Sequence, residues 1–289
     1  MFALGECRRR MREETTSTAS TRVAPASAGA TAGIVVRVLA TPEDYAACVA
    51  LQRVVWGASY GTVPGALIKV SQRIGGLAAG AFDPEGGMRG FIFGLTGVEE
   101  GAVVHWSHML AVHPAARDQG VGRLLKAYQL EAVRSLGAAR IEWTFDPLVA
   151  RNAHLNINVL GVDVRAYVRD MYPDTGSDLH SFGTDRLIVS LALTDVVRAR
   201  PQVSAAMRSA PIVSVADGGG AGVGVESSCV RIRVPGDIEA LAAADLDAAR
   251  AWRTSTRAAF QLCVGAGYRV VGFHSESRAT GAYVLARGG

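Results

Sequence analysis

The sequence predicts a mixed fold of the α/β or α+β class, in which helices flank a central sheet. Three observations lead to this prediction. The chain has 289 residues, of which 49% are apolar and 19% charged, so a sizeable core can form. Short β-branched runs alternate along the chain with segments of helical periodicity. Two of these runs are separated by a turn sequence alone, which indicates that those strands pair as an antiparallel hairpin.

The first predicted elements are a strand and two helices. Residues 34–39 form a β-branched run, which is typical of a strand. The segment Thr41-Pro42-Glu43-Asp44 then offers an N-cap, a proline for the first helical position and acids for the first turn. A helix is therefore expected from there to about Trp56. A second helical pattern covers residues 64–73.

A hairpin, a third strand and a helix are expected next. Residues 77–82 and 89–98 are apolar runs on either side of Asp83-Pro84-Glu85-Gly86-Gly87, a turn sequence. Residues 103–112 predict a third antiparallel strand, which Pro114 ends. The remaining predicted elements of this block are a helix at about 120–136 that closes at Gly137, a strand at 140–145, a helix at 151–160 that ends at Gly161, and strands at 162–168 and 185–193.

Composition divides the chain into four parts. Residues 1–33 are rich in Ser, Thr, Ala and Gly, so a disordered tail is expected. Residues 34–197 hold the predicted sheet. Residues 198–228 contain Gly218-Gly219-Gly220 and read as a flexible linker or long loop. Residues 229–289 are expected to form a β-α-β extension that packs on the main domain. Its predicted elements are strands at 230–234, 268–273 and 282–285 and a helix at 246–264.

Charge and cysteine content disfavour several classes of protein. The formal net charge is +4, and the five arginines and three glutamates of the first 33 residues account for half of it. The rest of the chain shows no basic stripe with interleaved aromatics, so no nucleic-acid partner is expected. The sequence contains no run of eighteen apolar residues, so no membrane-spanning helix is expected. Four scattered cysteines, without metal-binding spacing, indicate a reducing, cytoplasmic protein and no metal site; they are Cys7, Cys48, Cys229 and Cys263.

The most informative motif lies between the third hairpin strand and the following helix. A strand ends near Val112, and Arg117-Asp118-Gln119-Gly120-Val121-Gly122 then opens the helix. Glycines allow a ligand to approach the backbone, and free N–H groups at a helix start favour a pyrophosphate. The loop lacks the Gly-Lys-Ser/Thr of a Walker loop and the spacing of GxGxxG. Taken alone, a solvent-exposed turn explains it equally well.

In its context the motif resembles the signature of the GNAT acyltransferase superfamily. The signature Arg/Gln-x-x-Gly-x-Gly/Ala matches Arg117, Gly120 and Gly122, and the order of elements around it is also similar. Two downstream segments and a C-terminal Trp252-Arg253 helix resemble an uncharacterised bacterial branch of that superfamily. The two segments are Trp143-Thr144-Phe145-Asp146-Pro147-Leu148 and Asn152-Ala153-His154-Leu155-Asn156. The resemblance covers roughly residues 34–195.

The resemblance implies acetyl-CoA or another acyl-CoA as co-substrate. The pantetheine arm would pair with the backbone of residues 110–112, and the pyrophosphate would bind the N–H groups of residues 119–122. A splay of the strands beyond residue 112 would make room for it. Asn152 and Asn156 would face the cofactor from the other side, unless they are N-cap and surface residues. The expected cofactor contacts are Leu110, Ala111, Val112, Arg117, Asp118, Gln119, Gly120, Val121, Gly122, Arg123, Asn152 and Asn156.

The catalytic groups are less well marked. Relatives often carry a glutamate near the position of Trp106, which is not acidic here. His108 is the best local candidate for the base, because strand alternation would place it on the face of Trp106, Leu110 and Val112 and because histidine titrates near neutrality. A packed or surface histidine is the alternative. Glu142 and Asp146 are further candidates, although Asp146 also suits a turn. The general acid stays unassigned, with Tyr167 and Tyr172 nearby in sequence.

The acceptor is expected to be a small primary amine. Arg250, Arg253 and Arg257 lie on one helix face, and Arg253 and Arg257 with Arg186 would hold a carboxylate of an amino acid or of a succinyl group. A solvated face, or ion pairs with Asp245 and Asp247, is the alternative. The predicted function is N-acyl transfer by direct transfer in a ternary complex. An acyl-CoA sensor and a protein lysine or N-terminal acetyltransferase are the rivals, and a homodimer is left open.

Overall fold

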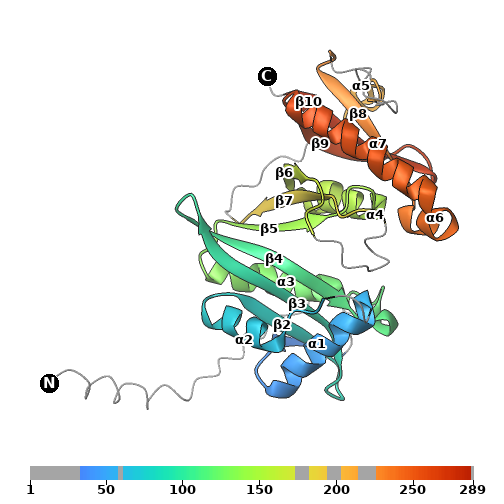
Figure 1. Ribbon diagram of the computed structural model, residues 1–289. Helices are drawn as coiled ribbons and strands as arrows, with labels where there is room; N and C mark the ends of the chain where they lie inside the picture. Colours follow the sequence, from blue (N-terminus) through green and yellow to red (C-terminus); the bar gives the residue numbers. More distant parts are fainter. Residues whose placement is uncertain (1–32, 58–60, 173–181, 194–202, 214–225, 288–289) are drawn as a thin grey trace.

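The computed structural model describes residues 33–57, 61–172, 182–193, 203–213 and 226–287. It has a seven-stranded sheet of order β1-β2-β3-β4-β5-β7-β6 and a three-stranded sheet of order β8-β10-β9 (Figure 1). The predicted class, a mixed and mostly antiparallel sheet flanked by helices, is confirmed. Most of the tail predicted at 1–33 lies outside the described residues.

The first block follows the predicted order of elements. Its strands are β1 (Val35–Val38), β2 (Leu77–Phe82), β3 (Met88–Glu99), β4 (Ala102–Val112), β5 (Arg140–Phe145), β6 (Asp163–Val168) and β7 (Arg186–Ala192). Its helices are α1 (Pro42–Trp56), α2 (Gly65–Arg73), α3 (Val121–Ser135) and α4 (Ala150–Ala153). The predicted cap of α1 is confirmed as a capping box, in which Thr41 and Asp44 accept from each other's backbone N–H groups.

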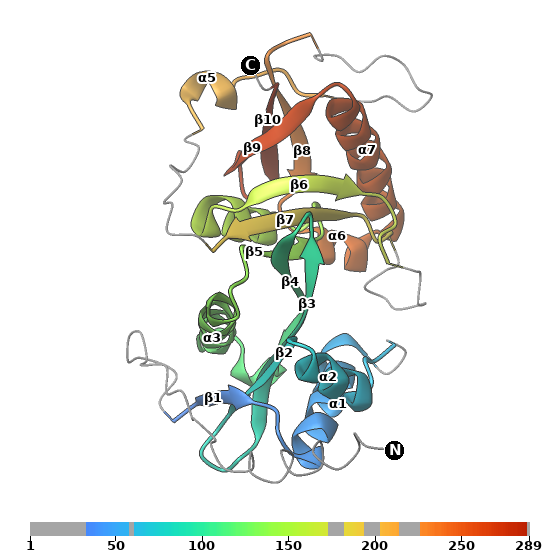
Figure 2. The ribbon, with the colours of Figure 1, turned by 90° about the vertical axis from the view of Figure 1, so that its left-hand side faces the viewer.

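The helices cover the two faces of the first strands. Helices α1 and α2 lie on one face, where Phe91, Phe93, Met109 and Ala111 are buried with residues such as Ile68. Helix α3 lies on the other face, where Ile92 is buried with Val121 and Leu125. Figure 2 shows α3 on one side of these strands and α1 and α2 on the other. Because side chains alternate along β3, this strand contributes residues to two separate hydrophobic cores, one on each face of the sheet.

Two irregularities of β4 shape the centre of the sheet. Between β3 and β4 the register shifts, because Phe93 pairs with Met109 but Gly94 pairs with Ser107. His108 is therefore the extra residue of a β-bulge. Between β4 and β5 the pairing is parallel and short, and it ends where Trp106 meets Glu142. The two strands separate beyond residue 106, so the splay begins six residues earlier than the sequence predicts.

The helix predicted at residues 151–160 changes its winding halfway. It starts as α4, continues as a π-helix over His154–Leu160, and ends at Gly161, whose φ is 69°. A left-handed φ of this kind is favourable only for glycine. The predicted end of this helix is thus confirmed, whereas the π-helical winding has no sequence signal.

The C-terminal extension is larger than the predicted β-α-β unit. It contains β8 (Cys229–Pro235), α6 (Ile238–Ala244), α7 (Leu246–Gly265), β9 (Tyr268–Ser275) and β10 (Thr280–Arg287). The short α6 was not predicted, because its alanine-rich seven residues carry little periodicity. Part of the expected linker is also ordered: helix α5 (Ala205–Arg208) is followed by Val213, which is buried and donates its N–H to the carbonyl of Arg231.

The extension shares its core with β5, β6 and β7. The ring of Phe260 on α7 stacks on that of Tyr167, with a centroid distance of 5.0 Å. The hydroxyl of Tyr283 on β10 donates to the carbonyl of Pro147 at 2.8 Å. Arg257 on α7 donates to Asp185, which lies just before β7, at 2.5 and 2.9 Å. The contacts between the extension and these strands thus include stacked rings, a buried hydrogen bond and an ion pair.

Asp185→Asn should make the protein less stable at neutral pH. Burial alone would raise the pKa of Asp185, but hydrogen bonds from Arg257 and Tyr167 outweigh it and lower the pKa to about 2. Its stabilising effect is therefore complete above pH 4 and is lost as the pH falls toward 2. We expect the substitution to remove about 3 kcal/mol from the free energy of unfolding at pH 7. Urea unfolding across pH 2–7 measures this.

Asp247→Asn is the matched control. Asp247 also forms an ion pair with an arginine of α7, Arg250, but this pair is exposed to solvent. An exposed pair contributes less than about 1 kcal/mol. Equal losses for the two variants would show that Asp185 does not anchor the extension.

Candidate functional site

A cleft of about 1610 Å³ opens where β4 and β5 separate. Its walls come from the second half of β4, the loop before α3, the exposed side of that helix, the end of β5, the π-helical segment and α6. Among the residues that the structure describes, no strand pairs with the β5-facing backbone edge of β4 beyond Trp106. The cleft therefore offers a ligand both apolar walls and unpaired strand backbone.

The glycine loop lies at the open end of β4. Gly120 is the N-cap of α3 with a φ of 82°, and Asp118 before it has a φ of 61°. This double left-handed turn exposes the first N–H groups of α3, which have no partner within the helix. The side-chain amide of Gln119 donates to the carbonyl of Ala115 at 2.9 Å and secures the loop. The arrangement is that of an anion site at a helix N-terminus.

Gly122 lies directly against the end of β4. A Cβ built on Gly122 would stand 3.6 Å from Val112 Cγ2 and 3.7 Å from Leu110 Cδ2, which is ordinary contact. A longer side chain there would extend into the cleft that Gly122 lines. Most of the predicted cofactor contacts of this region line the cleft, namely Leu110, Val112, Arg117, Asp118, Gly120, Val121, Gly122 and Arg123. The side chain of Ala111 instead lies in the α1/α2 core, so only its backbone could contact a ligand.

Asn152 and Asn156 both line the cleft on the side of the π-helical segment. Asn156 is buried, accepts a hydrogen bond from the indole N–H of Trp143 at 2.8 Å and donates to the carbonyl of Asn152 at 2.8 Å. It ties this segment to β5. Asn152 is not an N-cap, because α4 begins at Ala150 after Val149. The two asparagines thus form part of the wall.

The bulge overturns the predicted direction of the β4 side chains. Ser107 bonds to Gln129 of α3, and Leu110 and Val112 also lie on the α3 side. His108 instead lies edge-on to the ring of Phe93, with centroids 6.0 Å apart. The extra residue inverts the alternation, so His108 does not share the face of Leu110 and Val112. His108 still lines the cleft, and burial lowers the pKa of its imidazole.

Glu142 lies outside the cleft, contrary to its prediction as a catalytic residue. It lines a separate hollow of about 570 Å³ together with Trp106 and Arg165. The Glu142 carboxylate accepts from Arg140 Nε at 2.8 Å and lies 3.4 Å from Arg165 Nε. Glu142 is the last residue of β5 that pairs with β4, so it lies before the point where the two strands separate. Glu142 is thus an ion-paired residue beside the β4–β5 junction.

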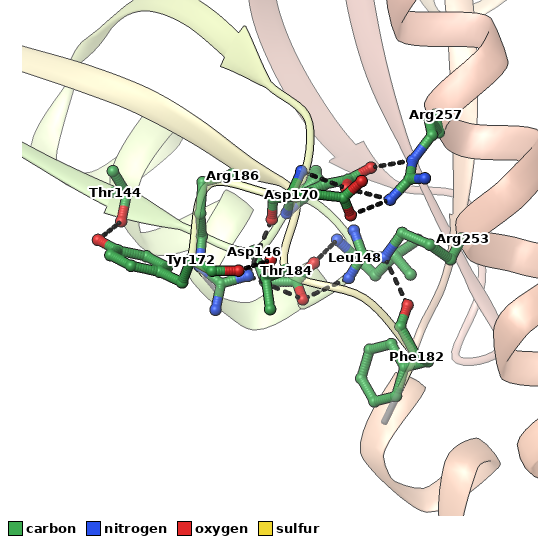
Figure 3. A network of polar contacts seen from close by, with 12 residues as sticks. Thr144, Asp146, Leu148, Asp170, Tyr172, Phe182, Thr184, Arg186, Arg253 and Arg257 are labelled. Carbon is green, nitrogen blue, oxygen red and sulfur yellow. Dashed lines mark hydrogen bonds and ion pairs between the residues drawn. The ribbon is translucent and has the colours of Figure 1, made fainter. Parts of the chain in front are cut away.

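Asp146 is bound by two arginines. Its Oδ2 lies 2.5 Å from Arg253 Nη2 and 3.6 Å from Arg186 Nη1. Its Oδ1 accepts the backbone N–H of Leu148 at 2.8 Å, which is the turn role that the sequence also allows. Figure 3 shows Asp146 between the two arginines.

Arg253 and Arg257 do not line the cleft, and their role in holding an acceptor stays a prediction. The buried Arg253 is held by Asp146 and by the carbonyl of Phe182, and Arg257 is held by Asp185 and Asp170 (Figure 3). Of the three predicted arginines, Arg186 alone lines the cleft. The acidic partners lie far along the chain, which is why the helix pattern alone suggested a free cationic face.

The sequence assigns no role to two polar residues that line the cleft. Tyr172 lines the cleft, and its hydroxyl lies 3.2 Å from Thr144 Oγ1. Lys126 of α3 lines it as well, with its Nζ 4.1 Å from the centre of the Trp143 ring. The available signal for this part of the site was Gln129, a polar residue on the otherwise apolar buried stripe of α3.

Gln129 is the centre of a buried polar network between α3 and β4. Its Oε1 accepts from Ser107 Oγ and from Lys126 Nζ, both at 3.0 Å. Its Nε2 lies 3.2 Å from His105 Nε2. Because Thr96 Oγ1 lies 2.9 Å from His105 Nδ1 and itself donates to a backbone carbonyl, His105 carries its proton on Nδ1 and accepts from Gln129.

Burial keeps His105 neutral by lowering its pKa to about 4. Gly94 provides the space for its ring, since a Cβ there would lie 2.2 Å from His105 Nε2. The hydrogen bonds of the network are therefore donated in one direction, from the Lys126 amine at the cleft through Gln129 to the neutral imidazole of His105.

No membrane-crossing helix occurs in the described part of the chain, since none there is long and apolar enough. Among the same residues, no group of three or more His, Cys, Asp or Glu side chains is placed to hold a metal ion.

No family model and no curated protein matches the sequence. Among solved structures, the chain is similar to the ribosomal-protein-S18-alanine N-acetyltransferase from Escherichia coli, at 18% identity and a TM-score of 0.44 over 57% of this chain and 99% of that one. It is similar to an aminoglycoside 6'-N-acetyltransferase complexed with coenzyme A, at 14% identity, a TM-score of 0.43 and the same coverage of 57% and 99%. A protein from Desulfovibrio desulfuricans described as an acetyltransferase of the GNAT family shows 18% identity and a TM-score of 0.41 over 56% and 99% of the two chains.

Proposed function

We propose that the chain is a GNAT-type acyltransferase that passes an acyl group from acyl-CoA to a primary amine of a small molecule. The observation that carries the proposal is the cleft between β4 and β5, which has an anion site at one end and an unpaired strand edge along its length. The N–H groups at the start of α3 suit a pyrophosphate. The free edge of β4 suits the amide groups of a pantetheine arm.

Acyl transfer requires that the acceptor amine lose its proton and that the oxyanion be stabilised. His108 lines the cleft and is neutral at pH 7, because burial lowers its pKa, so it is free to accept a proton. An unpaired backbone N–H of β4 would donate to the oxyanion. Arg186 and Tyr172 stand on the opposite wall, with the Arg186 guanidinium carbon 5.4 Å from the centre of the Tyr172 ring. Arg186 would hold a carboxylate of the acceptor or of a succinyl group.

Turnover with defined substrates tests this function. The protein is incubated with acetyl-CoA or succinyl-CoA and a panel of amino acids and other small amines, and free thiol is followed over time. We expect thiol release that depends on the amine. Binding of acyl-CoA without release for any amine, including peptides with free N-termini or lysines, would favour the sensor reading. Release with peptides alone would favour a protein-modifying enzyme, and failure to bind acyl-CoA would refute the proposal.

A further inference from the structure

We propose that Lys126 binds the sulfur atom of coenzyme A and gives it a proton as the acyl group leaves. The inference rests on the proposed function. It assigns the residue that protonates the leaving thiolate, a role for which the sequence motifs indicate no residue.

Lys126 stands at the closed end of the cleft. The last paired residues of β4 and β5 are Trp106 and Glu142, so Ser107 and Trp143 are the first residues of the two diverging strands. Lys126 Nζ lies 3.3 Å from Ser107 Oγ and 4.1 Å from the centre of the Trp143 ring. The amine therefore bridges both strands at the point where they part.

The geometry of the cleft brings a thioester to that point. A pyrophosphate bound at the start of α3 would lie beside Val112, at the open end of β4. From Val112 to Ser107 the strand rises roughly 16–17 Å. An extended phosphopantetheine arm spans such a length, so a cofactor that pairs with the free edge of β4 places its sulfur beside Lys126.

The Lys126 amine is available for a ligand. An ammonium has three donors, and contacts to Gln129 Oε1 and Ser107 Oγ engage two of them. Among the described residues, no carboxylate forms an ion pair with Lys126. Other titratable groups in this part of the site are His105, kept neutral behind Gln129, His108 on β4, and Asp146 just after β5, which is bound by Arg253. Burial lowers the pKa of Lys126 to about 7, so both protonation states are populated at neutral pH.

The proposed step balances as follows. The acceptor nitrogen forms a bond to the acyl carbon, and the carbon–sulfur bond breaks with its electron pair going to sulfur. Lys126 transfers a proton to this thiolate and gives the free thiol. The proton lost by the acceptor passes to His108 and then to solvent, from which Lys126 is protonated again. A thiol of pKa about 8.5 takes a proton from an ammonium of pKa about 7 with an equilibrium advantage of roughly thirtyfold.

Equilibrium binding of two ligands tests the assignment without knowledge of the acceptor. The affinities of coenzyme A and of desulfo-coenzyme A, in which hydrogen replaces the thiol, are measured by calorimetry for the wild type and for Lys126→Met. We expect the wild type to bind coenzyme A about tenfold more tightly than the desulfo ligand, and the two affinities to become equal in the variant. Methionine keeps the apolar stem, and the melting temperature should not fall because a buried ammonium is removed.

Arg123→Met is the matched control, because Arg123 lines the same cleft one turn earlier on α3. It should weaken both ligands alike and leave their ratio at the wild-type value. A ratio near one in the wild type, or a ratio unchanged by Lys126→Met, overturns the assignment of Lys126 and leaves the proposed function standing. Absence of binding by either ligand to the wild type overturns the proposed function, and this inference with it.

Discussion

Gly122→Glu should abolish the binding of coenzyme A. A Cβ at this position meets Val112 and Leu110 at ordinary contact distances, so the helix accepts a side chain without strain. The added carboxylate would occupy the N-terminus of α3, where the anionic pyrophosphate is expected to lie. Juxtaposition of like charges costs several kcal/mol, so the Kd should rise by more than about 10²-fold. Calorimetric titration of the folded variant measures the loss.

Gly265→Glu is the control for charge. It adds the same carboxylate to α7, where nothing lies within 4 Å of the new Cβ, and should leave affinity unchanged. Gly120 is less suitable for this experiment, because its φ of 82° would strain any other residue and disturb the loop itself. Wild-type affinity in folded Gly122→Glu would refute the placement of the pyrophosphate and the proposed mechanism.

His108→Gln should lower turnover by about 10²–10⁴-fold, the usual contribution of a general base, with little change in coenzyme A affinity. Glutamine keeps the size and hydrogen bonding of the side chain but does not titrate near neutrality. In the wild type, burial lowers the pKa of His108, so this base should be deprotonated at pH 7, and turnover should fall on the acidic side as the imidazole takes up a proton. The pH–rate profile of the variant should lack this limb.

His154→Gln is the control, because His154 is exposed on the π-helical segment and does not line the cleft. It should leave turnover and the pH profile unchanged. If His108→Gln also keeps both, His108 serves only to pack against Phe93, and the proposed base must be sought elsewhere along the cleft.

The parts of the fold that the sequence predicts well are those with local signals. The cap at Thr41, the turn at residues 83–87 and the glycines at 120, 137 and 161 each mark a boundary through their own chemistry, and the corresponding elements are confirmed. The glycine loop belongs to the same class, because a strand, a left-handed turn and a helix start are encoded within a few residues.

The features that the sequence could not predict depend on residues that are distant along the chain. The orientation of His108 follows from a bulge, which arises between β3 and β4 and cannot be read from alternation along one strand. The side chain of Arg253 is engaged by Asp146, an ion-pair partner 107 residues away in sequence. A helical wheel shows which residues share a face but not what the folded chain brings against that face.

The short junction between β4 and β5 also has a thermodynamic consequence. The strands pair over Val104–Trp106 and Arg140–Glu142. The buried cluster that involves α1 and α2 lies on one side of this junction, and most of the core shared with the extension lies on the other. A ligand in the cleft touches both sides at once. Ligand binding then stabilises, by mass action, the arrangement of the two halves that the few hydrogen bonds of the junction also hold in place. Occupancy of the cleft and the rigidity of the sheet are thereby linked quantities, and each increases the other.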